Sequence, residues 1–327
     1  MVSLVVCGAI NWDISCFVER LPVPGEKVII RQVTRVSGGT GANVAVAAAR
    51  ILGAKKVAMI GALGKDDIAR RQIAILEGEG VSAEGVQQID GVESGQAYIL
   101  IDQMGENVIA NHLGANARLA VEHLNKPQVK QQLQQCRGIV LTDPSLEVAG
   151  ELVNLAKKRG IPVLWDPGIL VYRDREKLQA VTREAEVLFL NETETRALLG
   201  TEEVNLSLQR LKELGLRNNV VLKLGAQGAV LLEPTSGTVM EVSALPMKDL
   251  GLNVVSTVGC GDAFAGVFAA YYVTGSTLEQ SLIMASAAGG LNAARPETRG
   301  SPDRAKLEEV VNRSQKLGFA IRQRKLS

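Results

Sequence analysis

Short apolar runs rich in β-branched residues alternate with helix-like stretches along most of this chain. The runs that are short and apolar enough to be buried strands are Leu4–Val6, Lys56–Ile60, Gly138–Thr142, Pro162–Trp165, Val187–Leu190 and Val220–Lys223. The stretches with apolar residues at helical spacing are Ala42–Leu52, Asp67–Glu79, Leu146–Arg159 and Leu206–Leu214. This alternation predicts an α/β fold in which helices sandwich a mainly parallel sheet. Ligands of such folds bind beyond the carboxyl ends of the strands.

Two segments, residues 11–37 and 94–114, interrupt the alternation with strand-like runs that have no helix between them. We expect them to form a small antiparallel β lid that projects from the core, although ordinary hairpins would give the same pattern. The nucleotide- and substrate-binding core would then comprise residues 1–10, 38–93 and 115–327. The last dozen residues are rich in Arg and Lys, and we expect a frayed tail there.

The charge of the chain is nearly balanced, with 36 basic and 35 acidic residues. Aromatic residues make up only 3% of the 327 positions. A balanced charge gives no chain-wide attraction to nucleic acid or to an anionic membrane, and few aromatic rings leave little base-stacking surface. We therefore expect neither nucleic acid nor a membrane among the partners.

Cysteine spacing and apolar runs indicate a cytoplasmic protein. The four cysteines lack CxxC or zinc-like spacing, which is typical of reduced thiols: Cys7, Cys16, Cys136 and Cys260. The apolar N-terminus has no basic segment or cleavage site of a signal peptide, and the apolar run Ala263–Val273 is shorter than the ~20 residues that a membrane span needs. With only two histidines in the chain, we expect carboxylates to perform any acid–base chemistry.

The strongest candidate site is the glycine-rich segment 256–268, where Gly259 and Gly261 precede Asp262 and a small, apolar helix follows. Backbone N–H groups at such a helix start form an anion pocket, which the helix dipole strengthens. An acid beside bound phosphate makes sense if Asp262 faces an incoming hydroxyl while the amides hold a migrating phosphoryl group. The alternative is that Asp262 only caps the helix.

Polar residues near the N-terminus form a second candidate group. Asn11 and Asp13 alternate onto one side of an extended chain and could grip vicinal hydroxyls. The segment Ser37–Asn43 then opens a helix, and its glycines let a ligand approach the backbone. Turn and capping roles would explain each element taken alone.

Two further turns follow predicted strands. Asn191 and Glu194 share a face of a first helical turn and could orient magnesium-bound water and phosphate oxygens, unless they merely start the helix. Lys223 precedes a turn that contains Gly225 and Gly228, and it could meet nucleotide phosphates or simply be solvated.

A dinucleotide site is a poorer explanation of these glycines. The segments that begin at Gly39 and Gly259 both lack the third glycine of GxGxxG, and neither precedes a ribose-binding acid at the expected distance. The chain has no Walker A sequence.

Taken together, the motifs resemble those of the ribokinase-like sugar kinases, also called the PfkB family. Residues 38–43 resemble the family's N-terminal signature, residues 257–262 its C-terminal one, and residues 191–194 its magnesium and phosphate motif. The resemblance runs essentially from end to end. Within the family, the chain is most similar to ribokinases, with which it also shares the segment Gly105–Asn116.

The resemblance implies a role for each candidate residue. Asp262 would be the catalytic base, with the amides of Gly259, Cys260 and Gly261 as the anion hole. The substrate contacts would be Asn11, Asp13, Gly38, Gly39, Asn43 and Asp143. The nucleotide side would comprise Asn191, Glu194, Lys223, Gly225, Gly228 and Asn292, with Mg²⁺ held by Glu194 through water.

Three positions depart from the family pattern. Ser256 replaces an Asp that usually helps to hold a monovalent cation, so potassium activation is not expected. Thr40 replaces a common lysine and Lys223 a common threonine. Exposed lid strands in this family often pair between subunits, which makes a homodimer through the lid the expected assembly.

These observations predict an ATP-dependent kinase that transfers the γ-phosphoryl group to a hydroxymethyl group of a small sugar, with ribose as the leading substrate. A nucleoside kinase or a sugar-phosphate kinase of the same family is the alternative. A non-catalytic protein that senses nucleotide or sugar is a more remote one.

Overall fold

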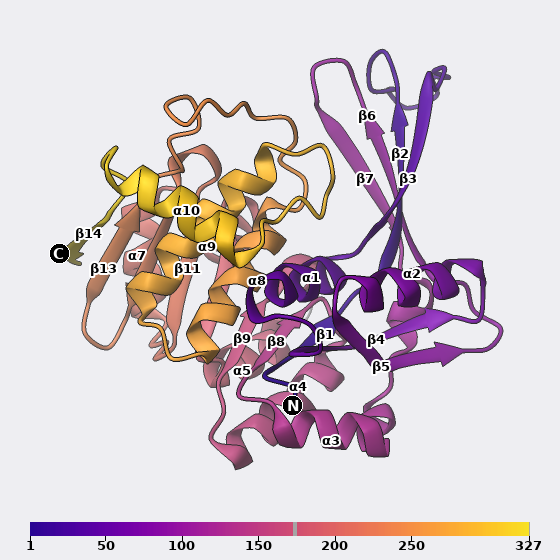
Figure 1. Cartoon of the computed structure of the whole chain (residues 1–327), viewed down its shortest axis with the longest axis horizontal. Helices are drawn as coiled ribbons and strands as arrows, with labels where there is room; N and C mark the ends of the chain where they lie inside the picture. The colour runs from indigo at the N-terminus through magenta and orange to yellow at the C-terminus, as the bar shows by residue number, and fades with distance from the viewer. Residues whose placement is uncertain (173–174, 327) are drawn as a thin grey trace.

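A ten-stranded sheet crosses the molecule, and a four-stranded sheet projects from one end of it (Figure 1). The computed structural model describes residues 1–172 and 175–326. In spatial order, the large sheet contains β14 (Ile321–Lys325), β13 (Thr238–Val242), β12 (Ala229–Glu233), β11 (Asn219–Lys223), β10 (Val187–Asn191), β9 (Val163–Asp166), β8 (Ile139–Thr142), β1 (Leu4–Gly8), β4 (Val57–Gly64) and β5 (Val81–Ile89). All neighbours from β11 to β5 are parallel, which confirms the predicted α/β class.

Helices cover both faces of this sheet. Alternate residues of a strand point to opposite faces, so each strand contributes to two cores. Leu4 and Val6 of β1 belong to a core that includes side chains of helices α1, α8, α9 and α10, whereas Val5 and Cys7 pack with those of α3, α4 and α5. The helices are α1 (Thr40–Leu52), α2 (Asp67–Gly78), α3 (Pro127–Gln135), α4 (Leu146–Arg159), α5 (Arg175–Glu184), α6 (Glu192–Leu199), α7 (Val204–Glu213), α8 (Cys260–Val273), α9 (Leu278–Ala293) and α10 (Arg304–Gln315). Short 3₁₀ helices are η1 (Gly114–Arg118), η2 (Val121–Asn125), η3 (Gly168–Tyr172) and η4 (Gly225–Gln227).

Helices α1 and α8 lie side by side (Figure 1). Both are rich in Ala and Gly. A Cβ atom added at Gly266 would lie 2.5 Å from the carbonyl oxygen of Val44, so only glycine permits this approach. The contact brings the N-terminal turns of two helices that are far apart in the sequence into one place.

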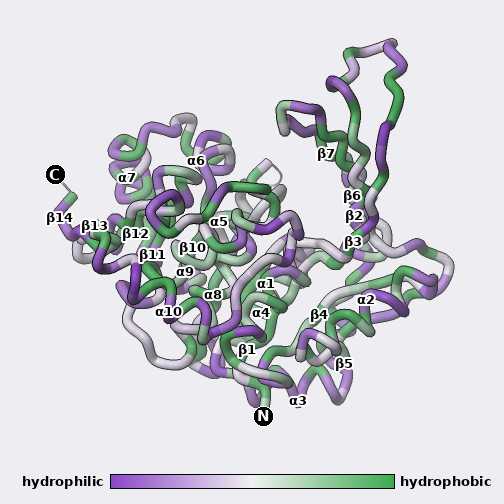
Figure 2. The backbone as a smooth tube through the Cα atoms, turned by 45° about the horizontal axis from the view of Figure 1, so that its top comes forward, coloured by the Kyte–Doolittle hydropathy of each residue, from purple (hydrophilic) through white to green (hydrophobic). Residues whose placement is uncertain are grey.

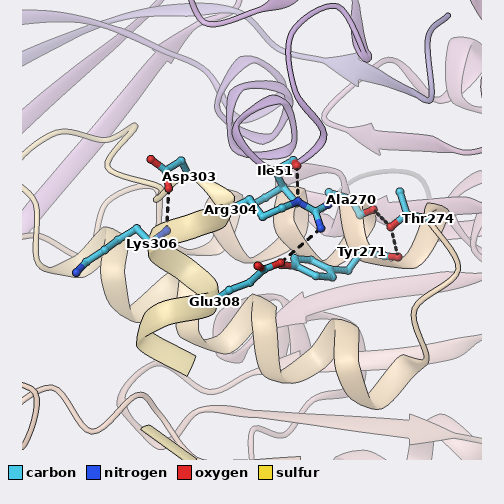
Figure 3. Close-up of polar contacts among 8 residues, drawn as sticks. All are labelled: Ile51, Ala270, Tyr271, Thr274, Asp303, Arg304, Lys306 and Glu308. Atoms are coloured by element: carbon cyan, nitrogen blue, oxygen red, sulfur yellow. Dashed lines mark hydrogen bonds and ion pairs between the residues drawn. The ribbon is translucent and has the colours of Figure 1, made fainter. Parts of the chain in front are cut away.

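Helix α10 docks on this pair through Arg304 (Figure 3). The Arg304 Nε donates to the Ile51 carbonyl at the end of α1, 2.9 Å away, and the guanidinium lies 5.1 Å from the ring centroid of Tyr271 in α8. The Tyr271 hydroxyl in turn donates to Glu308 of α10 at 3.2 Å. One side chain therefore ties α1, α8 and α10 together.

The second sheet has the strand order β3 (Gln32–Gly38), β2 (Asn11–Phe17), β6 (Gly95–Ile101) and β7 (Asn107–His112), and it stands away from the core (Figure 2). Its outer pairs, β3 with β2 and β6 with β7, are antiparallel as predicted. The central pair β2–β6 is parallel, so the sheet as a whole is mixed. The two hairpins come from distant parts of the chain, and the sequence pattern carried no information on how they would pair.

The expectation of a frayed C-terminal tail is wrong. Residues 321–325 form β14, which pairs with β13 in antiparallel register, and Arg324 Nε donates to Glu241 of β13 at 2.6 Å. Ile321 packs against the core, whereas Arg322, Arg324 and Lys325 are charged, and charged side chains are typical of an edge strand. Among the described residues, no helix has the length and hydropathy required to cross a membrane.

Replacing Arg304 by Met should lower the free energy of unfolding by about 1–3 kcal/mol, because a charge-assisted hydrogen bond and a cation–π contact are lost together. Thermal or urea unfolding monitored by circular dichroism measures this. Lys306→Met, which removes only an exposed ion pair of the same helix, is the matched control and should cost less than ~1 kcal/mol. Equal effects of the two substitutions would contradict the tying role of Arg304.

Candidate active site

Asp262 lies in the first turn of α8, whose N-cap residue is Gly259 with φ of 78°. A Cβ atom at Gly259 would lie 2.1 Å from the Thr298 carbonyl oxygen, so this left-handed, tightly packed position requires glycine. The Cys260 amide donates weakly to Thr257 O at 3.3 Å. In the described part of the chain, the amides of Gly261 and Asp262 have no backbone acceptor, which leaves them available to an anion.

The Asp262 carboxylate is held by the other glycine-rich helix start. Asn43, in the first turn of α1, donates from Nδ2 to Asp262 Oδ2 at 2.7 Å. Burial raises the pKa of Asp262 to about 6, and the nearby Asp166 adds to this, whereas the Asn43 hydrogen bond and the charges of Lys223 and Arg299 oppose it. A half-buried carboxylate with a pKa just below neutrality suits a general base.

The predicted substrate residues of the N-terminal segment converge on the same place. Asp13 is buried in β2, next to Gly38 at the end of β3, and burial raises its pKa to about 7 against the opposing charge of Arg299. Asn11 begins β2, and its Oδ1 accepts a hydrogen bond from Asn116 at 2.8 Å. Gly39 is the N-cap residue of α1, beside the backbone of Asn11.

Asp143 follows β8 and lies against the start of α1. Its Oδ2 accepts a hydrogen bond from the Thr40 hydroxyl at 2.9 Å, and its backbone adopts a left-handed conformation with φ of 56°. Such a conformation is uncommon outside glycine and asparagine-like residues, and it clusters at ligand sites. The residue that replaces the family's lysine, Thr40, thus contacts the acid that we predicted to bind substrate.

The predicted nucleotide side contains a buried charge cluster. Lys223, at the end of β11, forms an ion pair with Asp166 at the end of β9. Burial disfavours the charged form of Lys223, but the carboxylates of Asp166 and Glu194 outweigh this and raise its pKa. The Nζ atom of Lys223 lies 3.5 Å from the place that a Cβ atom added at Gly261 would occupy, so the ammonium lies beside the backbone amides at the start of α8. Lys223 is therefore not a solvated surface lysine.

Asn191 and Glu194 form a capping box at the start of α6. Asn191 accepts from the Glu194 amide and donates through Nδ2 to Glu194 Oε1, each at 2.8 Å, while the Asn191 amide donates to Oε2. The helix-start reading is thus correct, and a ligand role requires no change in it. Burial, followed by the nearby Asp166, raises the pKa of Glu194 to about 7.

The other predicted nucleotide residues lie on a turn and on a helix. Gly225 begins η4, shortly after β11, and Gly228 follows η4; both have positive φ. Asn292, in the last turn of α9, is only 1% exposed and donates from Nδ2 to the Val258 carbonyl at 3.1 Å, so it supports the turn that precedes α8. Its predicted proximity to adenine stays a prediction.

Two residues of the site were missed in the sequence. Asp166 follows a predicted strand, so the rule that ligands bind at carboxyl ends of strands could have found it. Arg299 lies in the loop after α9, and its Nε donates to Asn43 Oδ1 at 2.8 Å. No motif in the sequence marks Arg299.

The cluster combines open amides, an ammonium and several carboxylates at the mouth of two helices. Donors aimed at an anion beside a carboxylate of raised pKa are the parts that phosphoryl transfer to a hydroxyl needs. The carboxylates of Asp166, Glu194 and Asp262 outnumber the single buried ammonium of Lys223 in this cluster. Where the structure describes the chain, no three acidic, His or Cys side chains are placed to ligate one metal ion, so a divalent cation here would keep part of its water shell.

Comparison with known proteins agrees with this geometry. The model of the pfkB family of carbohydrate kinases matches residues 1–305. The chain belongs to this family. It is therefore a phosphotransferase that acts on an alcohol group, and the predicted family and type of enzyme are confirmed.

Several relatives of this kinase have names that specify a pentose. It is 31% identical over 305 residues to an ATP-dependent ribose-1-phosphate kinase of Halopiger xanaduensis, with 92% of this chain and 95% of the relative covered. It is 30% identical to a deoxyribokinase of Salmonella typhi, with 86% and 89% covered. Among solved structures, Arabidopsis thaliana ribokinase complexed with ribose and ATP aligns at a TM-score of 0.81 and 26% identity, over 95% of this chain and 99% of that one.

Replacing Gly259 by Ala should disrupt the turn that presents the amides, because the added methyl would lie against the Thr298 carbonyl. We expect a loss of about 2–4 kcal/mol, the sum of the backbone strain at positive φ and of overpacking. Thermal unfolding measures it. Gly275→Ala is the matched control, since Gly275 has φ of 95° but no atom within 4 Å of an added Cβ, and it should show only the strain of ~1–2 kcal/mol. A cost no greater than that of the control would show that Thr298 does not confine this turn.

Proposed function

We propose that this kinase transfers the γ-phosphoryl group of ATP to the hydroxymethyl group of ribose, with Asp262 as the general base. The observation that carries the proposal is the Asn43–Asp262 hydrogen bond, because it joins the substrate-side helix start to the helix start with open amides. The substrate hydroxyl would lie at Asp262, and the amides of Gly259, Cys260 and Gly261 would stabilise the charge of the moving phosphoryl group. Of these, Cys260 contributes least, since its amide already has a weak acceptor.

The sugar would bind between α1 and the four-stranded sheet, which acts as a lid. The sugar ring hydroxyls would contact residues of the lid base and of the start of α1, namely Asn11, Asp13, Gly38, Gly39 and Asn43. Asp143, which accepts a hydrogen bond from Thr40 at the start of α1, would also contact the sugar. Acidic and amide side chains are strong acceptors and donors for neutral sugar hydroxyls. Ribose is therefore the first candidate.

ATP would bind along the turns after β10 and β11. Lys223 lies beside the open amides and would neutralise transferred phosphate, while Gly225, Gly228 and Asn292 border the nucleoside end. Glu194 would hold Mg²⁺ through water, with Asn191 and Asp166 nearby. When bound, this ion neutralises part of the negative charge of the phosphates. We expect no requirement for a monovalent cation, since Ser256 provides no carboxylate to hold one. The four cysteines are free thiols, which supports a cytoplasmic location.

A sugar phosphate is the second candidate. The 31% identity to a ribose-1-phosphate kinase supports it, as does the presence of Arg299 on the substrate side. A panel of ribose, 2-deoxyribose, ribose 1-phosphate and inosine distinguishes the candidates when ADP release is coupled to a spectrophotometric readout. The largest kcat/KM should be found with ribose, and a larger value with ribose 1-phosphate would assign the second candidate.

Replacing Asp262 by Asn should lower kcat by about 10²–10⁴-fold with little change in the KM for ATP, because only the proton acceptor is lost. In the wild-type enzyme, kcat/KM should rise with pH through about 6, where Asp262 loses its proton. The exposed Asp90→Asn is the matched control and should leave both parameters unchanged. A kcat for Asp262→Asn within a few-fold of wild type would remove Asp262 from this role.

We also infer that the lid pairs with a second copy of this chain. Its strands expose large apolar side chains, among them Val33, Val36, Tyr98, Val108 and Ile109, which a solitary sheet would leave in water. Replacing Val108, which is 55% exposed, by Asp should shift the molecular mass in light scattering from that of a dimer toward that of a monomer. Leu317→Asp, at a similarly exposed apolar site far from the lid, should not. A monomeric wild-type protein would refute the pairing.

A further inference from the structure

Arg299 reaches into the substrate side of the site from the loop between α9 and α10. Its Nε donates to Asn43 Oδ1 at 2.8 Å, and its Nη2 donates to the Gly38 carbonyl at 3.1 Å. The backbone of this loop is itself fixed, because Arg50 of α1 donates to the carbonyls of Arg299 and Ser301 at 2.7 and 2.6 Å. Arg50 is anchored in turn by an ion pair with Glu79.

The guanidinium of Arg299 and the carboxylate of Asp262 select the same orientation of the Asn43 amide. An asparagine amide has an acceptor end and a donor end, and either can face a given neighbour, whereas a guanidinium can only donate. With Oδ1 held by Arg299, the Nδ2 of Asn43 must face Asp262, to which it donates at 2.7 Å. The flipped amide would set its oxygen against the carboxylate and its NH₂ against the guanidinium, which is unfavourable on both sides.

We propose that Arg299 is a positioning residue for phosphoryl transfer, which acts by locking the orientation of the Asn43 amide that holds Asp262. The proposal rests on the proposed role of Asp262 as the general base. Arg299 does not touch the reacting atoms in this scheme. It ensures that the carboxylate is presented in one orientation, as a base that must meet a hydroxyl at hydrogen-bond distance requires.

The charge of Arg299 supports the same function. Burial lowers the pKa of Arg299 to about 10, so the guanidinium still carries its charge at neutral pH. That charge favours the ionised forms of Asp13 and Asp262, whose pKa values burial raises. The charged groups that act on Asp262 come from several elements: Asp13 of β2, Asp166 of β9, Glu194 of α6, Lys223 of β11 and Arg299. Loss of the guanidinium leaves Lys223 as the main opposing charge.

The test compares Arg299→Met and Arg299→Lys with the wild-type kinase. Arg299→Met should lower kcat by about 10–100-fold, the value of a hydrogen bond to a charged group, and should move the acidic limb of the kcat/KM profile to higher pH. Arg299→Lys keeps the positive charge but lacks the planar, two-pronged guanidinium. It should therefore restore the acidic side of the kcat/KM profile to its wild-type pH but recover only part of kcat. The matched control is Arg295→Met, which removes an exposed arginine of the same loop and should change neither.

Crystal structures of the same variants give a readout that does not depend on turnover. In Arg299→Met, the Asn43–Asp262 separation should exceed 3.5 Å, because the Asn43 oxygen is no longer held. If Arg299→Met does not fold, the comparison is made with Arg299→Lys alone, in which the Asn43 contact should lengthen. An unchanged pH profile and kcat, or an intact Asn43–Asp262 bond in the folded variant, would overturn the proposal.

Failure of the proposed function would look different. A wild-type kcat in Asp262→Asn, or the absence of ADP release with every substrate of the panel, would remove the role of Asp262. The dependence of the Asn43–Asp262 bond on Arg299 would still be visible in the crystal structures. The two ideas can therefore fail separately.

Discussion

The hydrogen bond between Asn43 and Asp262 depends on how closely α1 and α8 approach. These helix starts are separated by 219 positions in the chain, and they meet only because Ala and Gly residues let the helices pack almost backbone to backbone. Small residues bury little side-chain area at the contact, but their close packing fixes the position of one helix relative to the other. The relative position of Asn43 and Asp262 depends on this contact.

The charges of the site are arranged around that bond in two groups. Toward α6 and β11, Asp166 and Lys223 lie at the carboxyl ends of parallel strands and Glu194 in the helical turn that follows a third one, where fold class alone leads one to expect ligands. Toward β2, Asp13 and Asp262 face the guanidinium of Arg299. Each group holds more negative than positive charge in a partly desolvated space. Such an arrangement is costly to build into a fold for stability alone and is typical of binding and catalytic sites.

Much of this architecture could be predicted from the sequence, and the exceptions have physical reasons. The parallel sheet and the helix at Asp262 follow from local periodicity and glycine spacing, which are short-range signals. The strand β14 was missed because charged residues dominate an edge strand, and its pairing with β13 is a tertiary contact. The parallel β2–β6 pair was missed for the same reason, since strand partners are not encoded locally.

The same limit applies to the candidate site. Asp166 carried a usable signal, its place directly after an apolar strand, whereas Arg299 lies in an irregular loop whose course is set by Arg50 and Glu79. The capping box of Asn191 and Glu194 was one of the two interpretations of this motif, and it does not exclude the other, since each oxygen of the Glu194 carboxylate keeps a further lone pair for a ligand. Motifs identify residues well when backbone geometry defines them, and poorly when long side chains reach across the fold.

The parallel pair at the centre of the second sheet has a mechanical consequence. Asn11 is in register with both Gly38 and Gly95, so three strands leave the core at the same row of residues. Seven residues of β2 extend over ~23 Å, so a 10° tilt about that row displaces the free end by ~4 Å while moving Asn11 hardly at all. In the same tilt Asp13, two residues from that row, would move by only ~1 Å, so the distal end of the sheet could open or close while the polar residues at its base keep their places.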